Sequence, residues 1–217
     1  MLLVPLSILA SCTPDDQPEE TKDKILPVNA VDLGLSVKWA DKNLGAESAS
    51  ATGYYFAWGE TKSKETYSWE NYKWGNSSTT LTKYCASADY GTVDKKTVLE
   101  AADDIASVGL GGKWRMPTAD EWEELRTSCT WTQDTVDGVF GYKVSVKDGN
   151  ASIFIPAAGG YDGAEVYRQD AAGFYWSSSL YTKKSSLVEV MYFIPGAMTI
   201  SQAPRYYGLP VRAVLAE

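Results

Sequence analysis

The groups best suited to acid–base chemistry in this chain are carboxylates, because it contains no histidine. Two sets stand out: the adjacent pair Asp103 and Asp104, and the four acids within residues 120–124. Paired carboxylates act as acid and as base or nucleophile in glycoside hydrolysis. Both sets fall in segments with helical patterns, where a solvated helix face explains such acids without catalysis. The lack of imidazole excludes Ser-His-Asp and Cys-His nucleophilic sites and metal sites that need histidine.

Thiol chemistry is limited to three cysteines, Cys12, Cys85 and Cys129. None of them lies in a Cys-x-x-Cys pair, so the sequence does not support redox catalysis. For Cys85 and Cys129 two possibilities stay open. They form a disulfide, which an oxidising compartment would permit, or they are two buried free thiols.

The N-terminus indicates such a compartment. Its first ten residues, MLLVPLSILA, are apolar and about half as long as a membrane-spanning helix needs. A secretory signal peptide has an apolar stretch of this size followed by small residues. Here Leu9-Ala10-Ser11-Cys12 follows, which resembles a bacterial lipobox, where the peptide is cut before a cysteine that becomes lipidated. We therefore expect a lipoprotein signal peptide over 1–11 and lipid attachment at Cys12.

An acidic segment follows. Residues 13–24 (TPDDQPEETKDK) contain two prolines, five acids and no apolar side chain. Such a segment has nothing to bury, and we expect a solvated tether over 12–30. Acids just after the lipid cysteine are similar to the export signals of surface-exposed lipoproteins in some Gram-negative bacteria. We therefore expect an outer-membrane lipoprotein, exposed at the cell surface and held to the membrane by its N-terminal lipid.

The remaining chain has the composition of a folded domain, with 44% hydrophobic and 22% charged residues overall. Its formal net charge of -8 is opposite to what a nucleic-acid binder needs, so we expect no nucleic-acid partner. The aromatic residues are 8 Trp and 14 Tyr against 5 Phe. Rings that carry a polar group suit half-wet positions and binding surfaces.

We expect one domain over 31–217, because no low-complexity segment interrupts it. Two capping boxes, Thr97 with Glu100 and Thr118 with Glu121, predict two helices. Turn residues delimit short predicted strands over 37–39, 54–58, 142–146, 152–155, 175–177, 188–193, 197–201 and 211–214. Two helices with short antiparallel strands and long ordered loops indicate an α+β fold.

The predicted loops over 59–96 and 157–173 are long for a compact domain. Loops of this length are usually functional or held in place by their own side chains. Five aromatic residues are candidates to pin the first loop: Tyr67, Trp69, Tyr72, Trp74 and Tyr84.

Several strings occur together along the chain: VDLGLSVKW (31–39), YFAWGE (55–60), KWRMPT (113–118), FYWSSS (174–179) and Val211-Arg212. In this order and spacing they resemble the Fibrobacter major paralogous domain, which is found in many surface lipoproteins. That group is similar to the formylglycine-generating-enzyme branch of the C-type lectin fold. The same branch includes the variable proteins of diversity-generating retroelements. The resemblance covers about Val31 to Val214.

The resemblance implies a C-type-lectin-like α+β domain whose first and last strands, 37–39 and 211–214, pair with each other. In that fold the C-terminal segment displays a ligand-binding face, which maps here to residues 180–209. Tyr among small polar neighbours is also the composition of recognition loops. We predict that a glycan or protein ligand binds to Tyr181, Lys183, Lys184, Tyr192, Thr199, Gln202, Tyr206 and Tyr207. The strand of Tyr192 is largely apolar on both faces, and its outward orientation follows from the resemblance alone.

Two chemistries of related proteins lack their residues here. The formylglycine-generating relatives use a cysteine pair near the C-terminus, and no cysteine follows Cys129. Calcium-binding lectins use Glu-Pro-Asn or Gln-Pro-Asp with Trp-Asn-Asp, and the domain has no such set. We therefore expect no metal, no cofactor and an adhesin-like binding protein. The alternatives are a hydrolase or modifying enzyme of this fold that uses carboxylates, and a structural subunit with a large apolar patch.

Overall fold

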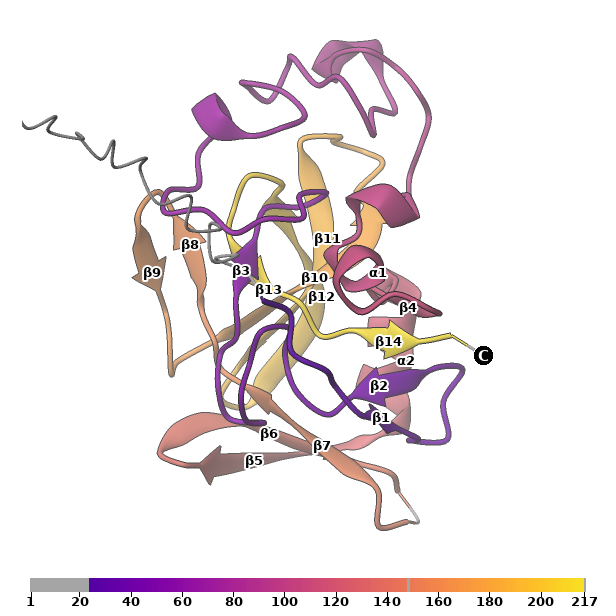
Figure 1. The fold of residues 1–217 in the computed structure, drawn as a ribbon, viewed down its shortest axis with the longest axis vertical. Coiled ribbons are helices and arrows are strands. Elements are labelled where there is room, and N and C mark those ends of the chain that lie inside the picture. Colours follow the sequence, from indigo (N-terminus) through magenta and orange to yellow (C-terminus); the bar gives the residue numbers. More distant parts are fainter. Residues whose placement is uncertain (1–23, 148, 217) are drawn as a thin grey trace, which may run out of the picture.

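The structure is a computed structural model that describes residues 24–147 and 149–216. Within these residues the chain has a mixed α+β fold, with two α-helices and mostly short antiparallel strands in several small sheets (Figure 1). The expected α+β class is confirmed. The expected signal peptide, Cys12 and most of the acidic tether lie outside the described residues. No helix in the described ranges is long and apolar enough to cross a membrane.

The strands are short except in the second half of the chain. Three 3-10 helices, η1 to η3, lie in the loops before the first α-helix. In chain order the elements are β1 Ala30–Val31, β2 Lys38–Ala40, β3 Tyr55–Phe56, η1 Trp69–Asn71, η2 Ala88–Tyr90, η3 Ala101–Asp103, α1 Ile105–Leu110, β4 Trp114–Arg115, α2 Ala119–Ser128, β5 Thr130–Val136, β6 Val139–Ser145, β7 Ser152–Pro156, β8 Gly160–Asp162, β9 Glu165–Tyr167, β10 Gly173–Leu180, β11 Leu187–Ile194, β12 Ala197–Pro204, β13 Leu209–Pro210 and β14 Val214–Leu215.

The two ends of the domain meet in one sheet, of order β1-β2-β14-β4. Strands β2 and β14 are antiparallel, with Val214 opposite Trp39 and Leu215 opposite Lys38. The expected pairing of the first and last strands is therefore confirmed. The last strand begins later than the expected range 211–214, because its first three residues form the buried connection between β13 and β14.

Packing begins before Val31, the residue at which we expected the domain to start. Ile25 and Val28 pack against a hydrophobic cluster of the domain, and Ala30 pairs with Ala40. The last residues of the segment that we assigned to the tether therefore contact the folded domain.

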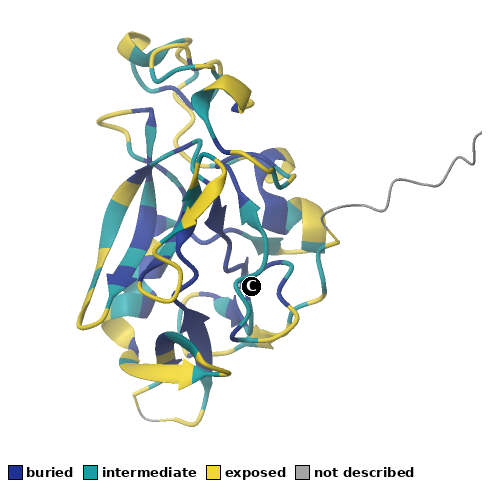
Figure 2. Ribbon diagram, turned by 90° about the vertical axis from the view of Figure 1, so that its left-hand side faces the viewer, coloured by how far each residue is buried: buried dark blue, intermediate teal, exposed yellow. Residues whose placement is uncertain are grey.

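The antiparallel sheet β10-β11-β12 separates two hydrophobic clusters. Side chains alternate along β11, so that Val188 and Val190 enter one cluster and Met191 and Phe193 the other. Figure 2 shows the buried residues gathered along the inner strands and the exposed ones on the loops and hairpins.

Helix α2 forms as its local sequence predicts. The Thr118 hydroxyl accepts the N–H of Glu121, and the Glu121 carboxylate accepts the N–H of Thr118. Trp122 and Leu125, one turn apart, are fully buried in the same cluster as Met191. The capping box and the apolar face of the segment therefore both favour the helix that forms.

The other capping box does not form, and the prediction of a helix starting after Thr97 is wrong. Helix α1 begins at Ile105, and its N-cap is Asp104, which accepts two backbone N–H groups. The helix ends at Leu110 and is capped by Gly111, which has a φ of 68°.

Long-range main-chain bonds explain this difference. The N–H of Leu99 donates to the carbonyl of Ser178, and the N–H of Leu180 donates to the carbonyl of Thr97. The Glu100 carboxylate is engaged by two lysines instead of closing the box. Pairing with β10 therefore overrides the local helical signal.

Six strands were not predicted: the two-residue strands β1, β4 and β13, strand β5, and the pair β8-β9. Strand β5 carries mostly exposed polar side chains and lies at the edge of the sheet β5-β6-β7. Strands β8 and β9 form a three-residue hairpin inside the predicted loop 157–173. Neither has the alternating apolar pattern that indicates a strand.

Side chains of Trp and Tyr donate hydrogen bonds to buried main-chain carbonyl groups. Trp58 donates to the carbonyl of Ser177, and Trp176 donates to that of Phe56. Further donations run from Trp122 to Trp176, from Tyr72 to Trp58 and from Tyr175 to Pro156. Phe has no such donor, which explains the preference for Trp and Tyr in a fold with little regular structure.

Arg212 joins three segments of the frame. It is fully buried and donates to Asn43 Oδ1 at 2.9 Å, to the Ala40 carbonyl at 3.1 Å and to the Phe154 carbonyl at 2.9 Å. Burial lowers the pKa of Arg212 to about 10. The guanidinium fork reaches all three acceptors, and a single ammonium group does not.

We expect Arg212→Lys to lower the free energy of unfolding by about 2–4 kcal/mol, because buried carbonyls lose their donors. Urea unfolding followed by Trp fluorescence measures this change. The control is Arg126→Lys, at a surface arginine paired with Glu123, which we expect to change stability by less than about 0.5 kcal/mol. Equal effects of the two substitutions would refute the structural role of Arg212.

Candidate ligand-binding face

The eight residues that we predicted to bind a ligand do not lie on one face. They are Tyr181, Lys183 and Lys184 in the turn between β10 and β11, Tyr192 and Thr199 paired across β11 and β12, Gln202 on the opposite face of that sheet, and Tyr206 and Tyr207 just after β12. The lysines, Thr199 and Gln202 are exposed, and the four tyrosines are half-buried. All eight therefore reach solvent, but in three separate places.

A row of rings connects Tyr206 and Tyr207 to Tyr192, and we call it the aromatic strip. Its six members, in order of contact, are Trp69, Tyr206, Tyr207, Tyr167, Phe174 and Tyr192. Successive ring centroids are 5.0, 5.0, 5.8, 5.4 and 4.8 Å apart, as in tilted and edge-on aromatic pairs. Every member is half-buried, so each ring is packed on one side and reaches solvent on another.

The strip is assembled from distant parts of the chain. Trp69 comes from η1 in the long loop, Tyr167 from the β8-β9 hairpin, and Phe174 and Tyr192 from adjacent strands, where they lie opposite each other. Figure 1 shows this hairpin, β9 and β8, on the left of the molecule.

Arg205 fixes the turn that carries Tyr206 and Tyr207 of the strip. It is fully buried, and its Nε donates to the Tyr72 hydroxyl at 2.9 Å. Its other nitrogens donate to the carbonyls of Lys83, Tyr84 and Ser185. Its guanidinium also lies 5.0 Å from the ring centroid of Trp58, a cation–π contact. No carboxylate forms an ion pair with it in the described part of the chain.

The long loop 59–96 is also tied to η3 through Asp103, which is 4% exposed. Its carboxylate accepts hydrogen bonds from Lys73 at 3.1 Å, from the Tyr84 hydroxyl at 2.7 Å and from Lys83. Burial on its own raises the pKa of Asp103, but these hydrogen bonds outweigh it and hold the pKa below its usual range. The loop is therefore held by a buried anion as well as by its aromatic residues.

Two of the other acids considered for catalysis, Asp104 and Glu121, also have structural contacts. Asp104 caps α1 and accepts the Met116 N–H at 2.7 Å, and burial raises its pKa. Glu121 is held by both terminal nitrogens of Arg115 as well as by the cap of α2. Burial on its own raises the pKa of Glu121. The hydrogen bonds from Arg115 and from the cap lower the pKa by more, so that it lies below its usual range. These contacts account for the acids without a reaction.

Of the two possibilities for Cys85 and Cys129, the structure has both as buried free thiols. Cys129 caps the end of α2 and belongs to the cluster of Trp122, and burial raises its pKa. The Sγ of Cys85 lies 3.1 Å from the carbonyl of Ser87. Both thiols are therefore packed as small apolar groups.

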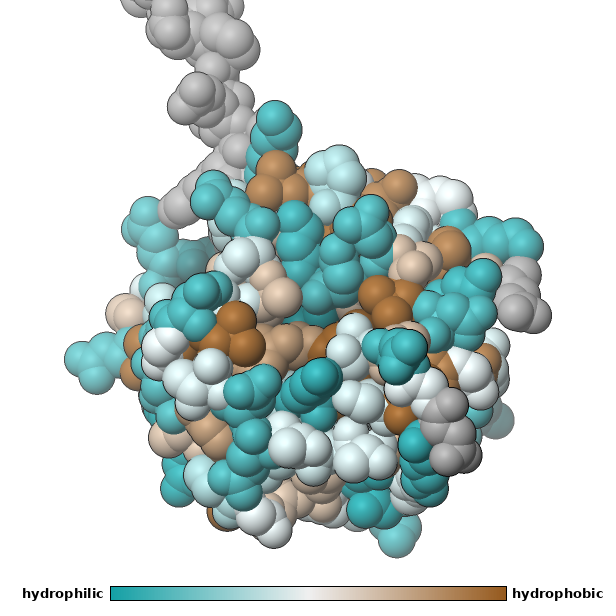
Figure 3. Space-filling view, turned by 90° about the horizontal axis from the view of Figure 1, so that it is seen from below, coloured by the Kyte–Doolittle hydropathy of each residue, from teal (hydrophilic) through white to brown (hydrophobic). Residues whose placement is uncertain are grey.

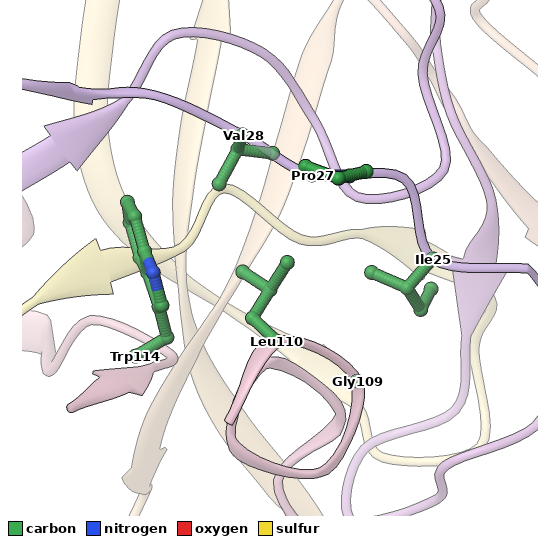
Figure 4. A pocket seen from close by; sticks show the side chains of 6 residues that line it. All are labelled: Ile25, Pro27, Val28, Gly109, Leu110 and Trp114. Atoms are coloured by element: carbon green, nitrogen blue, oxygen red, sulfur yellow. The ribbon is translucent and has the colours of Figure 1, made fainter. Parts of the chain in front are cut away.

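A pocket of about 190 Å³ lies where the described chain begins. It is lined by Ile25, Pro27, Val28, Gly109, Leu110 and Trp114, whose side chains come from the N-terminal segment, α1 and β4 (Figure 4). Its lining contains no acid or base, so it does not have the groups for hydrolysis. Among the described residues, no group of three or more Cys, Asp and Glu is placed to hold a metal ion.

The surface near β5, β6 and β7 is mixed in character. Figure 3, which views this end of the molecule, shows apolar side chains in small areas separated by polar ones. This face does not present one large apolar patch of the kind that buries itself in a stable assembly.

Sequence reasoning found three of the six residues of the strip as ligand-binding candidates and missed the other three. Trp69 was predicted only to hold the long loop in place, and Phe174 was part of a framework string. Tyr167 lay in the predicted loop 157–173, in which no residue was singled out. The missing signal was Gly163 between two short segments that each contain a Tyr and an acid, because glycine at the first position of a two-residue loop is typical of a β-hairpin.

We expect Asp103→Asn to lower the free energy of unfolding by about 1–3 kcal/mol at neutral pH. The folded-state pKa of Asp103 lies below the unfolded value, so its stabilisation is present above the unfolded pKa and is lost as pH falls through the folded pKa. The difference from the unsubstituted chain should therefore shrink below about pH 4, which urea unfolding at several pH values measures. The exposed Asp134→Asn is the control, and a pH-independent difference for Asp103→Asn would contradict this account.

Comparison of the chain with protein-family models, with curated proteins and with solved structures finds no match in any of the three. The candidate face is therefore defined by its own geometry. That geometry is a row of half-exposed rings held in place by a buried arginine and a buried carboxylate.

Proposed function

We propose that this protein is an outer-membrane lipoprotein, anchored through Cys12 and exposed at the cell surface, whose domain over 31–217 binds a glycan or protein ligand. In this proposal it is adhesin-like and not an enzyme. The ligand-binding face is the aromatic strip together with Thr199. The turn with Tyr181, Lys183 and Lys184 lies at one end of the same sheet and flanks that face.

We also propose that the domain has the C-type-lectin-like fold of the Fibrobacter major paralogous domain. The pairing of β2 with β14, the two helices and the long ordered loops support this assignment. Arg115 and Arg212, both within the framework strings that carry the resemblance, bind carbonyls and a carboxylate of the frame. Such a frame would leave its C-terminal segment to display side chains.

The observation that carries the binding function is the continuous contact of six half-buried rings drawn from η1, the β8-β9 hairpin, β10, β11 and the turn after β12. Rigid Tyr and Trp rings provide contact area at low conformational entropy cost. They also stack on sugar rings and on apolar or cationic protein side chains. Hydroxyl groups at the edge of each tyrosine add hydrogen bonds.

A hydrolase or modifying enzyme remains the alternative. It requires two carboxylates with space for a substrate between them. Asp103, Asp104 and Glu121 each have structural partners, which favours binding over catalysis.

We expect Trp69→Ala and Tyr206→Ala each to weaken ligand binding about tenfold, because half-exposed anchor rings dominate such faces. The measurement is binding of the labelled protein to glycan and peptide arrays with a chelator present, since stacking needs no metal. Tyr181→Ala is the matched control at the flanking turn, with a smaller expected effect. The proposal fails if both strip variants keep the binding profile of the unsubstituted protein while remaining folded.

We expect Cys12→Ser to abolish lipid attachment. Cells that express the variant should not incorporate labelled palmitate into the protein, and the protein should leave the membrane fraction. Cys85→Ser is the control, because its thiol is buried. Unchanged membrane association of Cys12→Ser would refute the anchor and leave the proposed face untouched.

A further inference from the structure

We propose that the aromatic strip recognises a basic segment of a partner protein, with Asp162 as the residue that pairs with its Lys or Arg. This inference rests on the proposed binding function and specifies the chemistry of the ligand. It is carried by an exposed carboxylate among tyrosine rings and by the charge around it.

Asp162 lies at the end of β8, next to the turn of the β8-β9 hairpin, and is exposed. Its Oδ1 accepts a hydrogen bond from the Tyr206 hydroxyl at 3.2 Å. Burial first and then Asp162 raise the pKa of Tyr206, of Tyr207 and of Tyr167, which places the carboxylate among three rings of the strip. Their hydroxyls remain protonated, and the only negative charge in the group is on Asp162.

The carboxylate has unused capacity. An ionised Asp accepts about four hydrogen bonds, and the hydroxyls of Tyr206 and Tyr207 are its side-chain partners among the described residues. No Lys or Arg forms an ion pair with Asp162 in the described part of the chain. By contrast, the buried acid Asp103 is paired with two lysines.

The hairpin around Asp162 is acidic. Glu165 and Asp170 are exposed and, like Asp162, have no ion pair among the described residues. The one base of this segment, Arg168, donates to the Tyr192 hydroxyl at 3.3 Å. Three acids against one base leave this segment with a net negative charge, which favours a cationic ligand over an anionic glycan or peptide.

The rings themselves favour the same charge, because the face of Trp or Tyr attracts cations. Elsewhere in this protein that interaction is satisfied internally: Arg205 lies over Trp58, and Lys73 over Trp74. None of the six rings of the strip has a cation over it within residues 24–147 and 149–216. The strip and Asp162 together form an aromatic site with an acid at its edge, which suits an extended Lys- or Arg-containing segment.

The test uses the full chain and two acetylated, amidated peptides. One alternates Gly with Lys and Arg, and the other has Gln in place of every Lys and Arg. We expect the basic peptide to bind, to weaken as salt rises, and to perturb the fluorescence of Trp69. Asp162→Asn should weaken its binding about fivefold, and the Gln peptide should bind weakly to both proteins.

Asp120→Asn is the matched control, with the same chemical change. Asp120 is exposed on α2, whose Trp122 packs with Met191 on the face of the central sheet opposite Tyr192. Equal binding of the basic peptide to Asp162→Asn and to the unsubstituted chain would overturn the inference, as would equal binding of the two peptides. Array binding that depends on Tyr206 but ignores Asp162 would also overturn it, while leaving the proposed binding function intact. Array binding that depends on neither Tyr206 nor Asp162 would contradict the proposed binding function itself.

Discussion

The guanidinium group of Arg205 is fully buried and has no carboxylate partner among the described residues. A buried charge is costly unless its hydrogen-bonding groups are used. Here the charge is met by carbonyl oxygens of the long loop and of the β10-β11 turn, and by the ring faces of Trp58 and Tyr72. Displacing the long loop would leave only the Ser185 carbonyl as an acceptor, and displacing the β10-β11 turn would remove that one. Arg205 therefore joins the long loop and the β10-β11 turn to the turn that carries Tyr206 and Tyr207.

The same constraint explains the aromatic composition. A fold with long irregular segments has many main-chain carbonyls without a strand or helix partner, and buried ones need donors. Trp58, Tyr72, Tyr175 and Trp176 provide these donors in the interior. At the surface the same residue types leave their hydroxyls and ring faces available. Core packing and the ligand recognition that we propose would thus draw on one chemistry, and burial would distinguish the two roles.

Features that depend on local sequence were predictable, and those that depend on distant contacts were not. The capping box at Thr118 forms because helix and burial pattern agree, whereas the box at Thr97 is lost to main-chain pairing with β10. Tyr206 was predicted from the composition of its segment, in which Tyr occurs among small polar residues. The sequence does not distinguish the neighbouring Arg205 from a surface arginine, because its carbonyl acceptors at Lys83 and Tyr84 lie far away along the chain.

The pairing of the chain ends determines how the domain carries mechanical tension. A pull applied N-terminal to residue 24 first meets the packing of Ile25 and Val28, and then β1, which is held by two residue pairs and by the contacts of Asn29 with Asp41. The next strand, β2, is bonded on both sides, and Arg212 holds its end at Ala40. Under load, the segment that ends with β1 would separate from the sheet first and lengthen the tether by several residues. The framework that carries the aromatic strip would keep its shape. For the surface-anchored protein that we propose, this order of separation would absorb shear force before the aromatic strip is disturbed.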